Sequence, residues 1–458
     1  MTALPETGLS ERLASLAEVS PAAVPVTDAR LHLVQAGGVS LFAQAGTPRR
    51  IVAVRLYWPG GSAMEDAGLA GLHAVTMQAL IRSPAPGSKT TMAEHLESAG
   101  VAVDAGATDC TAYLELRGPR EYLGHALTLA ASAVAGAELD EGAFQAARKH
   151  ALHGSRRRLR DLTMLASDTF RAARAAPGNF LARRPGGNVA SLDALSLTDC
   201  RALARKLAGR RLHLVIVGDQ RADDYLAAVS ALTSPLTSPL TSPLTSAGGE
   251  PDGGTAQRPA LCAEPPAELR AASGSAAHSY LGWGTAEGTA DLADHVAIEL
   301  AAYLLGGWSG SRWNALFREG LGLTYSVTSA HSSLSSGSLA PGDPACCLAQ
   351  VGFRVATKDL ATARDRLRRD IEDFVSAGPA PGEVNAAAVQ LLRTEAHFHD
   401  SARKMMARVG GLLQAGLGPD FAERRVSALR EIRADEIRDR MAALLRQPTL
   451  LVLSDAPE

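Results

Sequence analysis

A low-complexity segment near the middle of the chain restricts its fold more than any other feature. From Leu232 to Ser246 the sequence reads LTSPLTSPLTSPLTS, and proline returns every fourth residue, at 235, 239 and 243. Proline has no backbone N–H and a fixed φ, so neither a helix nor a central strand can run through the repeat. Glycine and proline remain frequent up to Gly254. The segment predicts a semi-extended linker, with a proline-rich docking ligand as the alternative.

The residues on either side of this linker show the same order of predicted elements. In the first half we expect a strand at 51–58, a glycine-rich turn, a helix at 69–82, an alternating strand at 110–117, helices from 121 to 174 and a strand at 212–217. In the second half we expect a strand at 279–283, a helix at 290–305, strands near 323–329 and 347–354, helices at 359–374 and from 381, and a strand at 449–453. The two halves therefore indicate an internal duplication.

This order of elements predicts an α+β fold of two homologous domains, each an antiparallel sheet covered by helices. The length of 458 residues suits two domains of about 200 residues. The predicted boundaries are an N-terminal extension at 1–29, a first domain at 30–228, the linker at 229–272 and a second domain at 273–458.

Composition excludes several classes of partner. The 46 Lys and Arg residues nearly balance the 48 Asp and Glu residues, so no global field favours nucleic acid or an anionic membrane surface. No stretch approaches the roughly 18 apolar residues that span a bilayer, and we see no signal-peptide pattern. The five cysteines have no CxxC spacing, and vicinal Cys346–Cys347 is not a usual disulfide or zinc pair. We expect reduced thiols in a cytoplasmic protein.

Residues 59–84, PGGSAMEDAGLAGLHAVTMQALIRSP, resemble the segment in which pitrilysin/insulinase-family metallopeptidases carry an H-x-x-E-H zinc motif. That motif places two imidazoles on one helical face and a glutamate beside the metal-bound water. With Gly71 aligned to the family glycine, the two histidine positions hold Ala74 and Gln78, and the glutamate position holds Met77. The third ligand of the family, a later glutamate, falls on Gly154. The resemblance therefore implies a degenerate site without metal.

Other histidines do not restore a metal site in the sequence. A motif shifted to begin at His73 would need Glu at 76 and His at 77, where the chain has Thr76 and Met77. His150 and His153 are spaced i, i+3 on a predicted helix, but no carboxylate or cysteine follows to complete a ligand set. We interpret them as an exposed helical pair.

Residues 304–327, LLGGWSGSRWNALFREGLGLTYSV, are similar to the substrate-side motif in the second half of the same family. The family pattern R-x-x-x-x-x-x-Y is met by Arg318 and Tyr325. The resemblance implies that these two residues bind the substrate backbone and stabilise the tetrahedral oxyanion. It also implies that Gly306, Gly307 and Gly310 form a substrate-binding loop, although a helix C-cap and turn would explain them too.

The chain thus lacks the zinc half of the site and keeps the Arg/Tyr half. The resemblance implies the zinc-less subunit of a bacterial heterodimer, which completes a partner's zinc site during proteolysis of peptides such as leader segments. It implies no cofactor in this chain, zinc in the homologous partner subunit, and a peptide as substrate. The alternative is a non-catalytic structural or peptide-binding homologue of the processing peptidases. An autonomous serine or cysteine hydrolase would need a nucleophile motif that we do not find.

Overall fold

The computed structural model describes residues 18–26, 32–36, 39–45, 50–135, 138–210, 212–218, 225, 256–289, 292–335, 345–398, 401–418, 420–433, 435, 438–440 and 448–455. The LTSP repeat of the predicted linker, residues 232–246, lies outside these residues. Within them, no helix has both the length and the apolar character that a bilayer span requires.

The first half of the chain builds a six-stranded sheet in the order β1-β2-β6-β3-β5-β4. Among the strand pairs that the structure describes in this half, only β2 and β6 run parallel. Its strands are β1 (His32–Ala36), β2 (Val39–Ala45), β3 (Ile51–Pro59), β4 (Ala102–Ala107), β5 (Thr111–Pro119) and β6 (His213–Gly218). Its helices are α2 (Leu72–Arg82), α3 (Met92–Ser98), α4 (Leu123–Ala135), α5 (Glu141–Arg158), α6 (Leu162–Arg174), α7 (Val189–Ala194) and α8 (Leu197–Ala208).

The second half builds a five-stranded sheet in the order β7-β11-β8-β10-β9. Its strands are β7 (Glu268–Ala271), β8 (His278–Thr289), β9 (Val327–Leu334), β10 (Ala345–Ala356) and β11 (Thr449–Leu453). Its helices are α10 (Leu292–Gly306), the π-helix η6 (Asn314–Gly320), α11 (Leu360–Ala377), α12 (Pro381–Phe398), α13 (Ala402–Gln414) and α14 (Phe421–Arg430). β7 runs parallel to β11, and the other pairs are antiparallel.

The two sheets share one topology. The order β2-β6-β3-β5-β4 in the first matches β7-β11-β8-β10-β9 in the second, including the single parallel pair at the same place. Each sheet also carries a long helix directly after its central strand, α2 after β3 and α10 after β8. The predicted α+β architecture is confirmed, and the repeated strand order agrees with an internal duplication.

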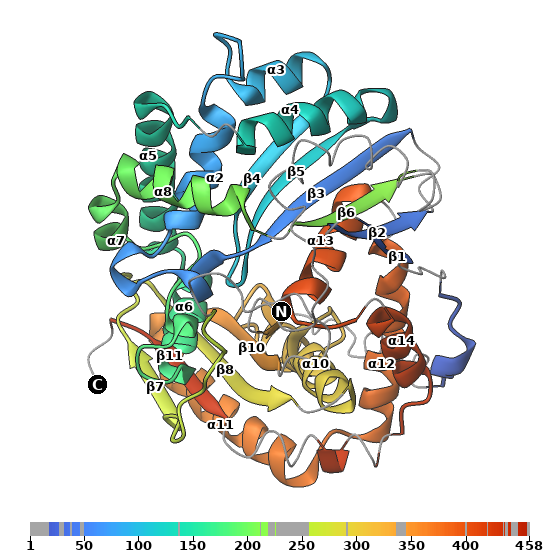
Figure 1. Ribbon diagram of the computed structural model, residues 1–458. Helices are drawn as coiled ribbons and strands as arrows, with labels where there is room; N and C mark the ends of the chain where they lie inside the picture. The colour runs from blue at the N-terminus through green and yellow to red at the C-terminus, as the bar shows by residue number, and fades with distance from the viewer. Residues whose placement is uncertain are drawn as a thin grey trace.

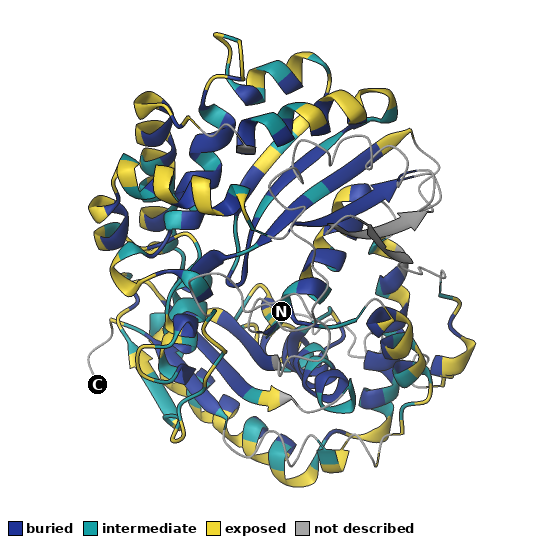
Figure 2. Ribbon diagram, in the orientation of Figure 1, coloured by how far each residue is buried: buried dark blue, intermediate teal, exposed yellow. Residues whose placement is uncertain are grey.

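The halves are joined by an exchange of helices (Figure 1). Helix α6 comes from the first half but packs on the second sheet, where Leu162 and Phe170 share a core with Tyr280 and Leu451. Helix α13 comes from the second half and packs on the first sheet through Met405, Met406 and Val409, against residues that include Tyr57 and Val215. Figure 2 shows the central strands of both sheets buried beneath these layers. Each half therefore completes the core of the other.

Two predicted boundaries differ from the structure. The linker was expected to run to 272, but Glu268–Ala271 is already strand β7, paired in parallel with β11. Before it, the Cys262 amide donates to the Arg174 carbonyl at 2.9 Å, so this stretch is tied to α6. The strand expected near 323–329 begins only at Val327, after an irregular stretch in which Gly322 adopts a left-handed conformation (φ 61°).

Candidate functional site

The positions aligned with the family's metal ligands meet in one pocket. Ala74 and Gln78 lie one turn apart on α2, and Gly154 lies on the neighbouring α5. All three line a pocket of about 520 Å³ that is also bounded by the edge strand β4. We call it the Ala74 pocket. The spacing on the two helices thus brings the three ligand positions together, as the alignment requires.

The side chains at these positions serve packing and hydrogen bonding. The amide of Gln78 donates to the carbonyl of Ala105 on β4, and its oxygen accepts from Arg82. Met77, at the position of the catalytic glutamate, is 2% exposed and belongs to the hydrophobic core rather than to the pocket lining. Gly154 has no side chain, and its surroundings are open. Gln78 therefore fastens α2 to the sheet edge where the family has a histidine.

The charges around this pocket also oppose a metal ion. Arg158 and Arg184 share the single carboxylate of Asp168, at 2.8 and 2.5 Å. Arg171 pairs with Asp109, and exposed Arg157 adds a further cation to the lining. The lining thus carries more positive than negative charge. Since zinc sites use thiolate, imidazole or carboxylate ligands, these residues do not fit zinc.

His73 is held away from the pocket by a local hydrogen-bond pair. It is 2% exposed, and its Nδ1 lies 3.0 Å from the carboxylate of Glu65. The same carboxylate accepts from the backbone amides of Gly71 and His73, at 2.8 and 2.7 Å. Glu65 therefore caps the start of α2 and fixes the imidazole. His150 and His153 are both exposed, in agreement with the prediction.

The segment that carries Arg318 is anchored in the core of the second half. Trp313 and Phe317 are fully buried and pack edge to face, with their ring centroids 6.2 Å apart. The carboxylate of Asp370 on α11 accepts from the Trp313 indole at 2.8 Å and from Arg312 at 2.9 Å. These contacts fix π-helix η6 on the second domain. Short π-helical turns occur often at functional sites.

Arg318 and Tyr325 lie beside each other at the surface. The guanidinium carbon of Arg318 is 5.7 Å from the centre of the Tyr325 ring, within range of a cation–π contact. The Arg318 side chain is 41% exposed and also pairs with Glu319 at 3.3 Å, while Tyr325 is 88% exposed. Neither residue belongs to the lining of the Ala74 pocket. The pair is thus positioned to contact a ligand or another molecule.

The structure gives packing roles to the glycines of the predicted substrate loop. A Cβ at Gly306 would collide with Val351 and Val327, so this glycine lets the end of α10 approach the sheet. A Cβ at Gly307 would meet the ring of Tyr303, and one at Gly310 would meet the ring of Trp308. A part in substrate binding stays a prediction for all three.

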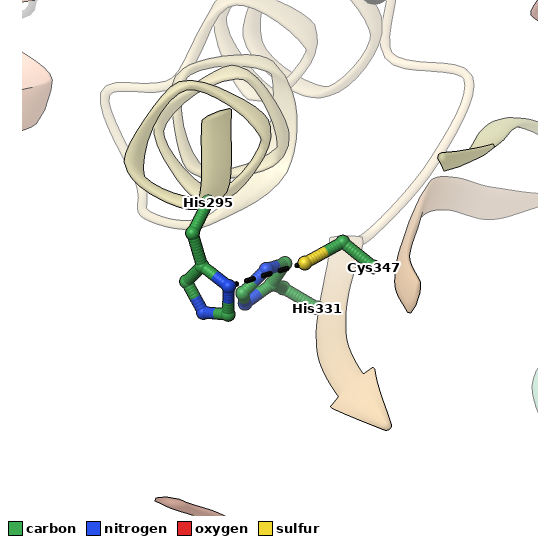
Figure 3. Close-up of side chains that lie close together, drawn as sticks. All are labelled: His295, His331 and Cys347. Carbon is green, nitrogen blue, oxygen red and sulfur yellow. Dashed lines mark hydrogen bonds between the residues drawn. The ribbon is translucent and has the colours of Figure 1, made fainter. Parts of the chain in front are cut away.

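A further cluster of polar side chains was not recognised in the sequence. His295 of α10, His331 of β9 and Cys347 of β10 point toward one another (Figure 3), with candidate ligand atoms all within 4.8 Å. The Cys347 sulfur lies 3.2 Å from His295 Nδ1 and 2.9 Å from the hydroxyl of Ser333. Burial lowers the pKa of His295 to about 4 and also lowers that of His331. We define these three residues as the His/Cys cluster.

Residues 195–391 match the model of the Peptidase M16 inactive domain. No curated protein matches the sequence. Among solved structures, the chain is similar to a peptidase M16 inactive domain from Pseudomonas fluorescens, with 17% identity, a TM-score of 0.74, and coverage of 93% of this chain and 98% of that one.

Two other structures show the same fold. One is a chain of complex III2 from Candida albicans, with 14% identity, a TM-score of 0.71, and coverage of 92% and 95% of the two chains. The other is the periplasmic protease PqqL from Escherichia coli, with 12% identity and a TM-score of 0.68. The match covers 96% of this chain and 48% of the protease. The chain thus has the fold of the peptidase M16 inactive domain from P. fluorescens along its length, and residues 195–391 match the sequence model of that inactive domain.

Proposed function

We propose that this chain is the zinc-less subunit of a heterodimeric metallopeptidase and that Arg318 and Tyr325 act in the active site of its zinc-bearing partner. The proposal rests on the contact between these two exposed side chains, in which the Arg318 guanidinium carbon lies 5.7 Å from the centre of the Tyr325 ring. The segment that carries them is anchored in the core. A tyrosine that is 88% exposed contributes little to this chain's own packing. Its place at the surface suits a contact with another subunit.

The chemistry of the pair suits peptide hydrolysis. The guanidinium of Arg318 stays charged at working pH and presents its donors in a fixed plane, and the phenol of Tyr325 adds one O–H donor. Donors aimed at an oxygen that gains charge in the transition state lower the barrier without tightening substrate binding equally. The pair would therefore bind the substrate backbone and stabilise the oxyanion on the scissile carbonyl.

The Ala74 pocket would receive part of the peptide. It lies against β4, the edge strand of the first sheet, where an extended peptide can add its backbone as a further strand. The excess of arginine in the lining favours an acidic peptide segment or a terminal carboxylate.

The length comparison supports assembly with a homologue, because this chain covers only about half of the E. coli protease. The five free thiols support a cytoplasmic location.

The test is steady-state peptide cleavage by the chain co-purified with a homologue that has an intact H-x-x-E-H motif, taken first from the neighbouring reading frame. Arg318→Ala and Tyr325→Phe should each lower kcat about 100- to 1000-fold with little change in KM. Arg318→Lys should not restore the rate, because an ammonium lacks the planar fork. Arg50→Ala and Tyr122→Phe, at exposed positions elsewhere, are the matched controls and should keep full activity.

A second candidate is a structural or peptide-binding subunit without catalytic residues. The similarity to a chain of complex III2 and to an inactive-domain model favours it. The same experiment separates the two functions. Near-wild-type turnover in assembled complexes of both the Arg318 and Tyr325 variants would exclude the catalytic role and favour the structural one.

A further inference from the structure

We propose that the His/Cys cluster of the second domain is a zinc-binding site of this chain, separate from the degenerate pocket of the first domain. The three ligands would be the imidazoles of His295 and His331 and the thiolate of Cys347, whose nearest ligand atoms lie within 4.8 Å of one another. Two imidazoles and one thiolate form a set that zinc binds readily, with the fourth position left for water or another oxygen.

The fold places these side chains together by register. In the β9–β10 ladder Ser333 lies opposite Cys347, and His331 lies opposite Ala349. Residues two apart in a strand share a face, so His331, Ser333 and Cys347 all belong to the same face of the second sheet. Helix α10 packs on that face and brings His295 to the sulfur at 3.2 Å. The next cysteine, Cys346, belongs to the core on the opposite face.

The hydrogen bonding of the cluster leaves room for an ion. The Nε2 atom of His331 is buried and has no hydrogen-bond partner among the residues that the structure describes, an arrangement that costs free energy unless a ligand fills the gap. The rings of His295 and His331 stand at 85° with centroids 5.0 Å apart, so they can approach one ion from two directions. Tetrahedral zinc separates its ligand atoms by roughly 3.5 Å, so small rotations of the side chains would close the site.

The surroundings suit the outer shell of such a site. A cavity of about 410 Å³ borders His295 and His331 and gives water a path to the fourth position. Glu299 lies one turn beyond His295 on α10, and Arg425 fixes its carboxylate by two hydrogen bonds of 2.6 and 2.7 Å. A carboxylate near metal-bound imidazoles compensates charge and orients the rings. The carboxylate of Glu299 in turn offsets the positive charge of Arg425.

The experiment uses the purified full chain without a partner, so its result does not depend on the proposed peptidase function. The chain is first treated with a chelator and then incubated with zinc. Metal analysis by mass spectrometry should then find about one zinc per chain, and zinc should raise the Tm of the protein. Cobalt(II) in place of zinc should give a thiolate-to-cobalt charge-transfer band in the near ultraviolet. Binding should release the thiol proton and hence weaken at low pH.

Neighbouring residues supply matched controls. Cys347→Ser should abolish the cobalt band, and His295→Gln and His331→Gln should remove most of the bound zinc. Cys346→Ser, one residue away but on the opposite face, should keep both signals. His150→Gln, in the lining of the Ala74 pocket, should also keep the bound zinc and the cobalt band. Absence of stoichiometric zinc in the folded wild-type chain, or equal binding by wild type and Cys347→Ser, would overturn the proposal.

Discussion

At the scale of single residues, Gln78 connects its own helix to the edge of the first sheet. Its amide joins the carbonyl of Ala105 on the edge strand to Arg82 on its own helix. A neutral histidine at this position would also have one donor and one acceptor, but on two ring nitrogens whose roles depend on the tautomer. The connection between α2 and β4 therefore depends on the amide.

Gln78→Ala should lower the free energy of unfolding by about 1–2 kcal/mol, because two partly buried hydrogen bonds are lost. Chemical denaturation at neutral pH measures the change. Gln145→Ala is the control, since Gln145 is exposed and bonds only to other surface side chains. It should shift stability by about 0.5 kcal/mol or less. Equal losses in the two variants would refute the structural role of Gln78.

Sequence reasoning reached some of these residues and missed others for a physical reason. Ala74 and Gln78 could be placed on one helical face because the 3.6-residue period fixes their relative positions. His295, His331 and Cys347 are separated by 36 and 16 residues, and no local period links a helix to two strands. Only the β9–β10 register and the packing of α10 bring them together.

At the scale of elements, Arg425 joins three helices of the second domain. From α14 it binds Glu299 on α10 and Glu395 on α12, and all three helices pack together behind the sheet. Burial alone would raise the pKa of the Glu299 carboxyl, but the guanidinium of Arg425 lowers it to about 2. Buried charges of this kind specify how the helices fit against each other.

Arg425→Met should cost about 3 kcal/mol at pH 7, because the partly buried Glu299 loses its cation and the buried Glu395 is left with Arg408. In the wild type, the folded pKa of Glu299 lies below its ordinary 4.5, so its contribution to stability is present above pH 4.5 and is lost as the pH falls toward 2. In the variant, burial favours the protonated acid, so the gap from the wild type should narrow on acidification.

Denaturation curves at pH 7 and pH 4 test this pattern. Arg424→Met is the control, because Arg424 is the adjacent residue but is exposed, and its ion pair in the described part of the chain is with Asp420 at 3.5 Å. It should be nearly neutral at both pH values. A pH-independent loss in Arg425→Met would show that packing, and not the ion pair, sets its contribution. Helix α10 and the start of α12 were predictable from the sequence. The pairing of Arg425 with carboxylates 126 and 30 residues away along the chain was not.

At the scale of the whole molecule, the exchange of α6 and α13 makes the two halves one cooperative unit. Phe170 of α6 lies against Gly284 of the second sheet, and Gly410 of α13 lies against Tyr57 of the first. Each contact joins a glycine to a fully buried aromatic ring, so neither side has room for a methyl group. The sequence indicated two similar halves but not this exchange, because hydrophobic periodicity does not say which sheet a helix covers.

Gly410→Ala should therefore destabilise the protein by about 1–3 kcal/mol, because the added methyl would collide with the buried Tyr57. Gly411→Ala, on the next residue of the same helix, meets no atom within 4 Å and should be neutral or stabilising by up to about 1 kcal/mol through helix propensity. Thermal unfolding of both variants tests the contact. A single cooperative transition is expected in each, and equal Tm values would contradict this packing.

The same exchange has a consequence for how such a chain could arise. A half-length ancestor with this fold would have left one face of its sheet open, and the equivalent helix of a second copy could cover it. Two copies that cover each other in this way form an isologous dimer, in which one surface meets its own symmetry mate. Fusion of two such genes would turn the dimer contact into the present interior.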